Sequence, residues 1–223
     1  MYEYLIGSLI FLFFWCILYF IRKDLRKTML LCSFSFAPLA FLCDLYCISW
    51  YWNPRTLFNS DFSIESFISG FAFGGIAAAI YKVAFKMRLR KVKENATRKQ
   101  TLIFIAIVVI FAFSIGLTLR MTIVHDSIFT AVLGALVIMF FRRDLIKEMI
   151  LGSILFSVFY FIVLFTINTF ISPDWIARTW NFSFLWGVSF LKIPIEEILW
   201  AWSFGLVWAP IYEYVGGYTL ERF

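Results

Sequence analysis

The chain has 223 residues, of which 62% are hydrophobic and only 15% are charged. An average soluble domain is about 45–50% apolar and about 25% charged. Its 29 Phe, 10 Tyr and 9 Trp residues are spread along the whole length, so no stretch of ordinary soluble composition remains. This excludes a cytosolic enzyme with a single membrane tether and indicates an all-α integral membrane protein.

The first apolar segment begins MYEYLIGSLI, without basic residues, and ends in RKDLRK without a small-residue cleavage site. These flanks predict a retained span and not a signal peptide. All four cysteines fall within the first 47 residues, mostly in apolar runs. A thiol in such a run behaves as a small hydrophobe, so we expect no disulfide framework.

Seven stretches are long and apolar enough to cross a bilayer core of about 30 Å as helices, which takes roughly 20 residues each. Lipid leaves a bare backbone unsatisfied, and the length of these stretches excludes barrel strands. The predicted spans are Tyr4–Ile21, Thr28–Ile48, Phe62–Phe85, Thr101–Leu119, Ile123–Phe141, Met149–Ile171 and Ile193–Tyr214. We therefore expect a multi-pass protein of the cell membrane.

The basic residues between the spans predict an orientation. Sixteen of the 20 Lys and Arg residues follow the odd-numbered spans. The positive-inside rule then places the N-terminus outside and the C-terminus in the cytoplasm. The basic stretch Arg88–Lys99 is interpreted as a loop against anionic lipid, so the lipid bilayer and not nucleic acid is the expected partner of these charges.

The chain also contains an internal repeat. Phe20-Ile-Arg-Lys-Asp-Leu-Arg-Lys27 recurs as Phe140-Phe-Arg-Arg-Asp-Leu-Ile-Lys147, and Ile64-Glu65-Ser66 is echoed by Ile195-Glu196-Glu197. The order predicts a 3+1+3 plan: a three-helix repeat at 1–86, a basic loop and linking helix at 87–119, and a second repeat at 120–223. Because an even number of spans separates equivalent helices, the repeats are parallel and related by an axis along the membrane normal. The alternative is a chance match between two common stop-transfer flanks.

Four carboxyl groups lie within or at the edge of the predicted spans: Asp44, Glu65, Glu196 and Glu197. A carboxylate at such a position costs roughly 2.5–3.5 kcal/mol on insertion scales, so it requires an explanation. If Glu65 and Glu196 are equivalent, the axis brings them to matching places around one central cavity. Glu197 is turned by about 100° on the same helix. The alternative is that these groups lie at the interface, bonded to nearby basic residues, without any chemistry.

Tryptophan residues accompany these acids. Trp50 and Trp52 follow Asp44 and fit an interfacial belt, whereas Trp200 lies one turn from Glu196 on the same helix face. An acid beside an indole could protonate an apolar substrate and hold the resulting cation against a π face. The alternative for each of these tryptophans is that it simply faces lipid or packs against other side chains.

The segment Pro194-Ile-Glu196-Glu197-Ile-Leu-Trp200 resembles the Pro-x-Glu-Glu-x-Leu-Phe motif of the small integral-membrane lycopene cyclases. Cys43-Asp44 followed by Trp50-Tyr-Trp-Asn-Pro54 is similar to that family's Trp-Asp and Trp-x-Phe-x-Pro segments. The resemblance extends over nearly the whole chain, because the fused members consist of two three-span repeats joined by a helix. The first repeat departs from the pattern with Ser63 and Ser66, and the second has Thr166 and Asn168 where an Asp like Asp44 is expected.

The resemblance implies an intramolecular lyase or isomerase that cyclises the ψ-ends of an acyclic carotenoid such as lycopene. A general acid protonates the terminal alkene, the neighbouring double bond attacks the cation, and a base removes a proton. This chemistry is redox-neutral, so no cofactor is expected. Gly70-Phe-Ala-Phe-Gly-Gly75 lies within a predicted helix and indicates close helix packing, not a dinucleotide loop. Other enzymes of carotenoid biosynthesis are candidate partners.

The acid in this reaction must stay neutral in a dry site, where burial and a second carboxylate both disfavour the anion. We expect Glu196 to be the acid, with Glu65 or Glu197 as the base or as the neighbouring carboxyl group, and Asp44 as an orienting residue. Three further residues are expected to contact the substrate: Trp200, Trp52 and Pro194.

Other classes of membrane protein also have several apolar helices. A small-solute transporter of the SWEET type, which also has parallel three-helix repeats, is the alternative. A retinal receptor is disfavoured because the last span has no lysine after Lys192, and a Glu-Glu protease because the chain has one histidine, His125, interpreted as a solvated loop residue. A structural or scaffolding role stays open.

Overall fold

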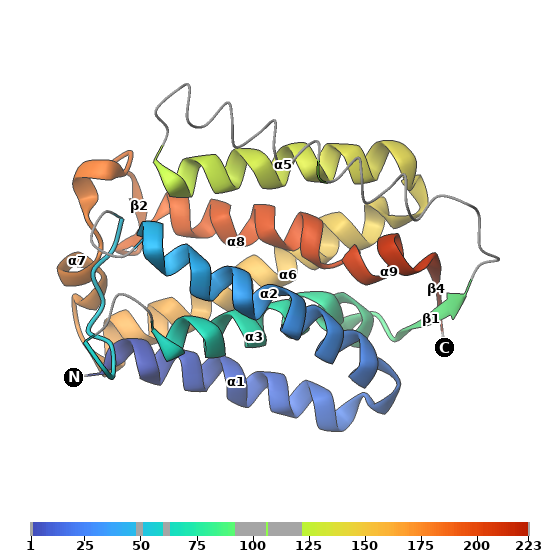
Figure 1. Ribbon diagram of the computed structural model, residues 1–223, viewed down its shortest axis with the longest axis horizontal. Helices are drawn as coiled ribbons and strands as arrows, with labels where there is room; N and C mark the ends of the chain where they lie inside the picture. Colours follow the sequence, from blue (N-terminus) through green and yellow to red (C-terminus); the bar gives the residue numbers. More distant parts are fainter. Residues whose placement is uncertain (1, 48–50, 60–62, 92–105, 107–121, 223) are drawn as a thin grey trace.

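The longer helices lie side by side along the long axis of the molecule, with the two termini at opposite ends (Figure 1). The computed structural model describes residues 2–47, 51–59, 63–91, 106 and 122–222. Within these residues the chain is mostly helical, as expected.

The helices of the described residues are α1 Glu3–Ile21, η1 Lys23–Leu25, α2 Arg26–Cys47, α3 Ile64–Ala84, α5 Ile123–Phe141, η2 Arg143–Leu145, α6 Ile146–Thr166, η3 Ile167–Ile171, α7 Trp175–Thr179, η4 Phe182–Phe184, α8 Ile195–Trp208 and α9 Ile211–Gly216. The strands are β1 Met87–Lys91, β2 Ser189–Phe190, β3 Ile193–Pro194 and β4 Tyr218–Arg222. β1 pairs antiparallel with β4, and β2 with β3. The stretch predicted as a basic loop, Arg88–Lys99, therefore begins as a strand.

Five helical segments of the described chain are long and apolar enough to cross a membrane. They are α1, η1 with most of α2, α3, α5, and η2 with α6 and η3. The predicted span Ile123–Phe141 coincides with α5 at both ends. Large apolar side chains on these helices face outward, among them Phe13, Leu136, Phe140 and Ile162. Apolar surface of this extent suits lipid better than water, so the chain is a membrane protein.

The last predicted span, Ile193–Tyr214, is wrong as a single helix. α8 has 14 residues and ends at Trp208, and α9 begins after Pro210. Proline has no backbone N–H and its ring clashes with the carbonyl four residues earlier, so the helix is interrupted there. The predicted linking span, Thr101–Leu119, lies outside the described residues except at position 106.

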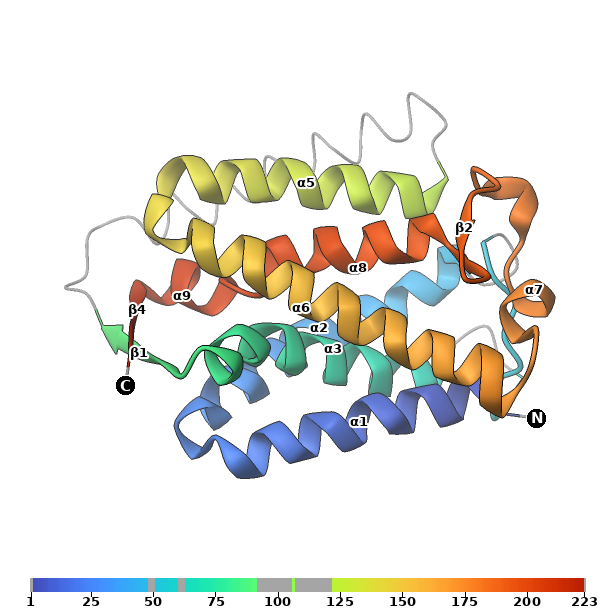
Figure 2. The ribbon, with the colours of Figure 1, turned by 180° about the vertical axis from the view of Figure 1, so that it is seen from behind.

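The helices pack in two similar groups. α3 packs against α1 and α2, and α8 packs against α5 and α6. Between the groups, α3 contacts α6 and α8. Seen from behind, α6 runs obliquely from the turn beside α5 to the end of the molecule where α7 lies (Figure 2).

Close approach of these helices depends on glycine. A Cβ added to Gly74 of α3 would lie 2.5 Å from the carbonyl oxygen of Cys32 in α2. A Cβ added to Gly205 of α8 would lie 2.6 Å from the Cα of Ser153 in α6. Gly70 likewise meets α2 directly, at Ala40. The prediction that the glycines of 70–75 serve helix packing is thus confirmed.

The two RKDL-like segments fold into the same turn. Nε and Nη2 of Arg22 donate to the Asp24 carboxylate at 2.9 and 2.8 Å, and the same atoms of Arg142 donate to Asp144 at 2.8 and 2.7 Å. Each arginine also donates to two backbone carbonyls further along its half, those of Lys82 and Met87 for Arg22 and those of Glu213 and Tyr218 for Arg142. Arg22 therefore holds the end of α3 and the start of β1, and Arg142 holds α9 and the start of β4.

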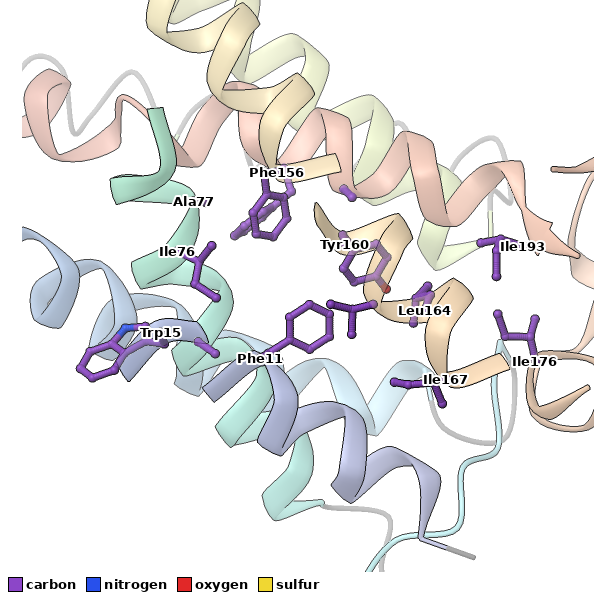
Figure 3. Close-up of a cluster of buried hydrophobic side chains, with 14 of the residues drawn as sticks. Phe11, Trp15, Ile76, Ala77, Phe156, Tyr160, Leu164, Ile167, Ile176 and Ile193 are labelled. Carbon is purple, nitrogen blue, oxygen red and sulfur yellow. The ribbon is translucent and has the colours of Figure 1, made fainter. Parts of the chain in front are cut away.

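The largest apolar cluster fills the space between the groups (Figure 3). Phe11 of α1 and Ile76 of α3 meet Phe156, Tyr160 and Leu164 of α6 there. Toward the α7 end the cluster continues through Ile167, Ile176 and Ile193. This cluster supports the first turns of α3 and α8, where the acidic residues lie.

Candidate functional site

Glu65 and Glu196 occupy the first turns of α3 and α8 and are completely buried. Oε1 of Glu65 accepts the backbone N–H of Leu57 at 2.7 Å, and Oε1 of Glu196 accepts the backbone N–H of Trp186. In both residues Oε2 is buried and has no hydrogen-bond partner within the described residues. Each carboxyl group is thus held by one oxygen, while the other is available to carry a proton.

Local structure explains how the Glu196 carboxyl group meets its donor. The β2–β3 hairpin turns the chain back just before α8, and the Ile195 N–H donates to the Val188 carbonyl at 3.0 Å. This fold-back places the Trp186 N–H at the first turn of α8. Pro194, one of the predicted substrate contacts, is buried in β3 as the residue before α8.

Glu197 has entirely different surroundings from its neighbour. Its Oε1 accepts from the hydroxyl of Tyr51 and, at 2.8 Å, from the indole N–H of Trp180, and its Oε2 accepts from the hydroxyl of Tyr160 at 2.6 Å. Tyr51 follows α2, Tyr160 lies in α6 and Trp180 follows α7. Three neutral donors around one buried carboxylate stabilise its negative charge.

The donors to Glu197 join the two groups of helices. The Asn53 N–H donates to the Thr179 carbonyl at 2.8 Å, and the Asn181 N–H donates to the Tyr51 carbonyl at 2.9 Å. The rings of Trp52 and Trp180 lie 5.3 Å apart, and Trp52 also meets Tyr4 edge-on at 4.5 Å. Trp52 therefore belongs to the wall between the two groups. Trp50 lies outside the described residues.

Asp44 is buried near the end of α2 and bonds to Ser63, the N-cap residue of α3. Its Oδ2 accepts from the N–H and the hydroxyl of Ser63, at 3.0 and 2.9 Å, and its Oδ1 accepts from the Ser66 hydroxyl at 2.5 Å. A carboxylate at this place suits the positive end of the α3 dipole. Both oxygens are satisfied, so Asp44 fixes the turn that carries Glu65.

The sequence placed Trp200 on the same helix face as Glu196, but its ring lies beside Tyr160, which donates to Glu197. Its ring stacks on Phe204 with centroids 5.4 Å apart, and it lies 5.6 Å from the Tyr160 ring and 5.9 Å from the Phe73 ring. These rings form an aromatic wall beside the hydroxyl that donates to Glu197.

No hydrogen bond or ion pair among the described residues links Glu65 with Glu196. Two basic residues near the acids in the sequence, Arg178 and Lys192, contact other carboxyl groups. Arg178 lies 3.7 Å from Glu3, and Lys192 donates to Asp174 at 2.9 Å, which holds the pKa of Asp174 below its usual range.

His125 was interpreted from the sequence as a solvated loop residue, and this is wrong. It lies in the first turn of α5 with its side chain 12% exposed, and its Nε2 is 3.8 Å from Oε1 of Glu196. Its Nδ1 shares a hydrogen bond with the Thr122 hydroxyl, and its ring lies 4.6 Å from that of Trp186. The signal was its position inside the predicted span Ile123–Phe141.

A buried charge cluster was also missed. Nζ of Lys82 in α3 lies 2.6 Å from Oε1 of Glu148 in α6 and 2.6 Å from Oε1 of Glu213 in α9. All three side chains are almost completely buried, although the sequence suggested that Lys82 belongs to a basic loop. Lys82 is about 25 Å along α3 from Glu65, at 1.5 Å per residue, so this cluster is separate from the acids described above.

A comparison with protein families finds a match for the second group of helices. Residues 124–215 match the family described as lycopene cyclase, a stretch that includes α5, α6 and α8 with Glu196 and Glu197. No curated protein and no solved structure matches the chain. The family recognised from the Pro-Ile-Glu-Glu motif is thereby confirmed, and nothing found supports the transporter alternative.

Proposed function

Since residues 124–215 belong to the lycopene cyclase family, we propose that this membrane protein closes rings at the ψ-ends of an acyclic carotenoid such as lycopene. The observation that carries the proposal is the Glu196 carboxyl group in the matched half, completely buried, with one oxygen bonded and the other unpartnered among the described residues. A carboxyl group in this situation can hold a proton away from water and give it to an alkene.

The proposed reaction is an intramolecular isomerisation with no change of oxidation state. Oε2 of Glu196 gives its proton to one carbon of the terminal double bond, which leaves a tertiary cation on the other. The neighbouring double bond attacks this cation and forms the ring bond, moving the charge to a ring carbon. Loss of an adjacent proton to a base restores a double bond, so the product has the same composition as the substrate.

Glu197 is proposed as the negative charge opposite the cation, and then as the base that takes the final proton. Its three donors stabilise the carboxylate, which favours an anion at this position until that proton is taken. The rings of Trp200 and Tyr160 beside it offer π faces to the same cation. Trp52 and Pro194 are proposed to border the substrate, and Asp44 to orient the turn that carries Glu65.

Glu65 is proposed as the counterpart of Glu196 in a duplicated chain. Both have one backbone donor on Oε1 and an unpartnered Oε2, and the arginine turns at Arg22 and Arg142 make matching bonds. We propose repeats at 1–86 and 120–223 with a linking helix between them, which gives seven spans if α8 and α9 together form the last one. Termini at opposite ends of the helices are consistent with an outside N-terminus and a cytoplasmic C-terminus in the cell membrane (Figure 1).

The test is a pigment analysis of a lycopene-accumulating host that expresses the chain. The wild type should convert lycopene to cyclic carotenoids, and Glu196→Gln should abolish conversion while the protein stays in the membrane at the same amount. Glu221→Gln, in β4 at the opposite end of the molecule, is the matched control and should convert normally. Conversion retained by Glu196→Gln would remove this residue from the mechanism, and a wild type without conversion would overturn the function.

A further inference from the structure

The buried acid of the second half has a titratable neighbour that its counterpart lacks. The Nε2 atom of His125 is buried, has no hydrogen-bond partner within the described residues, and faces Oε1 of Glu196 across 3.8 Å. Position 5, which precedes His125 by the same 120 residues that separate the two arginine turns, is a leucine. Glu65 therefore has no equivalent imidazole from α1.

The histidine ring is oriented from two sides. The Thr122 hydroxyl bonds to Nδ1, and the Trp186 ring lies against the imidazole at a tilt of 31°. The same Trp186 supplies the backbone N–H that holds Glu196. A rotation of His125 that shortens the 3.8 Å separation by about 1 Å makes a hydrogen bond to the carboxyl group.

Few charged groups face this imidazole. Among the described residues, Glu196 of α8 is the one ionisable group within ion-pair distance of the His125 ring. Asp126 is the next residue on α5. His125 is partly exposed, whereas Glu196 is completely buried. The imidazole thus lies between the surface and the buried carboxyl group.

We propose that His125 is the proton-relay residue that reloads Glu196 after each cyclisation. The inference rests on the proposed function and adds a step to it. Glu196 becomes a carboxylate once its proton has moved to the alkene. The protonated imidazole transfers its Nε2 proton to Oε1 of this carboxylate, which it faces. A half-turn of the carboxyl group about its Cγ–Cδ bond then brings the protonated oxygen to the position of Oε2, and the neutral imidazole regains a proton from water. The proton taken by the base returns to water, so the cycle balances.

His125 acts through Glu196 and touches no substrate, so it is a positioning and relay residue. Its loss should slow turnover without weakening substrate binding. Histidine suits this task because its unperturbed pKa is near neutrality. The absence of a histidine at position 5 implies that the relay serves the second half alone.

The experiment uses purified full-length protein in liposomes with lycopene as substrate and compares His125→Gln, His125→Ala and wild type between pH 5 and 9. His125→Gln should lower kcat about 10- to 100-fold with KM unchanged. Free imidazole should restore a measurable part of the rate to His125→Ala. Ser127→Ala is the matched control, because among the described residues the Ser127 hydroxyl bonds to the Val124 carbonyl of its own helix, at 2.7 Å, and not to His125 or Glu196.

The outcomes separate the relay from the function. A His125→Gln variant with wild-type kcat, or one with raised KM and unchanged kcat, overturns the relay and leaves the cyclase function intact. Failure of imidazole to restore His125→Ala also overturns it. A wild type without any cyclase activity overturns both. If the His125 variants do not reach the membrane, Thr122→Val, which frees the ring but keeps the imidazole, must change the pH dependence of kcat, and an unchanged profile overturns the relay.

Discussion

Glu196 and Glu197 are adjacent at the start of α8, but they have different hydrogen-bond partners. Glu196 has one backbone donor and an unpartnered oxygen, whereas Glu197 has three side-chain donors. One helical position, about 100° of rotation, separates the two environments. The proposed division of roles, with Glu196 as the acid and Glu197 opposite the cation, rests on this difference in hydrogen-bond partners.

The donors to Glu197 give the first prediction. Tyr160→Phe removes one of its three hydrogen bonds and keeps the ring that packs against Phe11 and Trp200. A hydrogen bond to a charged group is worth about 1.5–3 kcal/mol, so turnover should fall roughly 10- to 100-fold if Glu197 balances the cation. The measurement is kcat on lycopene, with Tyr2→Phe at an exposed position as control. An unchanged kcat would argue that Glu197 has only a structural role.

At this scale the sequence predicted that Asp44, Glu65, Glu196 and Glu197 are buried, but it missed the buried acids Glu148 and Glu213 and did not predict what surrounds any of them. A carboxyl group in an apolar run is visible in the sequence, and so is the Pro-Ile-Glu-Glu motif at Pro194. The three donors to Glu197 come from segments far apart in the chain, and only the fold brings them together. His125 and Lys82 lie inside the predicted spans Ile123–Phe141 and Phe62–Phe85, but they were assigned to the adjoining loops because a polar side chain near the end of an apolar run is usually exposed to solvent.

At the scale of elements, the cap on α3 determines where Glu65 points. Asp44→Asn should destabilise the protein by about 1–2 kcal/mol, because an amide cannot accept three hydrogen bonds as the carboxylate does. The expected result is a lower unfolding temperature in detergent. Asp174→Asn, at an exposed N-cap without a side-chain hydrogen bond to its helix, is the control and should change the temperature little. Equal stability of wild type and Asp44→Asn would show that the cap is dispensable.

The two arginine turns give a paired prediction about elements. Arg22→Gln and Arg142→Gln each remove a two-point carboxylate contact and two bonds to backbone carbonyls. If the halves are equivalent, the two variants should lose similar stability, about 1–3 kcal/mol each, measured by unfolding in detergent. A large loss in one variant and none in the other would contradict the equivalence of the turns.

The length of the apolar stretches predicted the bounds of the long helices α1, α5 and α6 well. α5 has the predicted bounds, and α1 and α6 differ from theirs by a few residues. The prediction failed for α8, because a hydropathy average over Ile193–Tyr214 does not register Pro210 or the hairpin at β3. The sequence analysis also missed β1 and β4, because each strand has only five residues and β1 lies at the start of the basic stretch that was interpreted as a loop.

At the scale of the whole molecule, Lys82 connects the two groups of helices. It bonds to Glu148 of α6 and Glu213 of α9, and its Nζ also donates to the carbonyls of Ala78 and Ala209. Two carboxylates meet one ammonium group with nearly no exposure to solvent. Such clusters contribute little when complete and cost much when one partner is removed.

Lys82→Met should therefore destabilise the protein by about 3–5 kcal/mol, because it leaves two buried carboxyl groups without their cation. The triple variant Lys82→Met, Glu148→Gln, Glu213→Gln should recover most of this loss. The measurement is the unfolding temperature of the purified protein in detergent, with Lys91→Met in the exposed β1 strand as control. A single variant as stable as the wild type would show that the cluster does not hold the groups together.

The central claim is that ring closure begins with a proton from Glu196, and solvent isotope labelling tests it most directly. Purified protein in liposomes is given lycopene in D₂O, and the products are analysed by mass spectrometry. The account predicts one deuterium on carbon for each ring closed by the wild type, and no cyclic product from Glu196→Gln. Cyclic product without deuterium, or labelled product from Glu196→Gln, would contradict it.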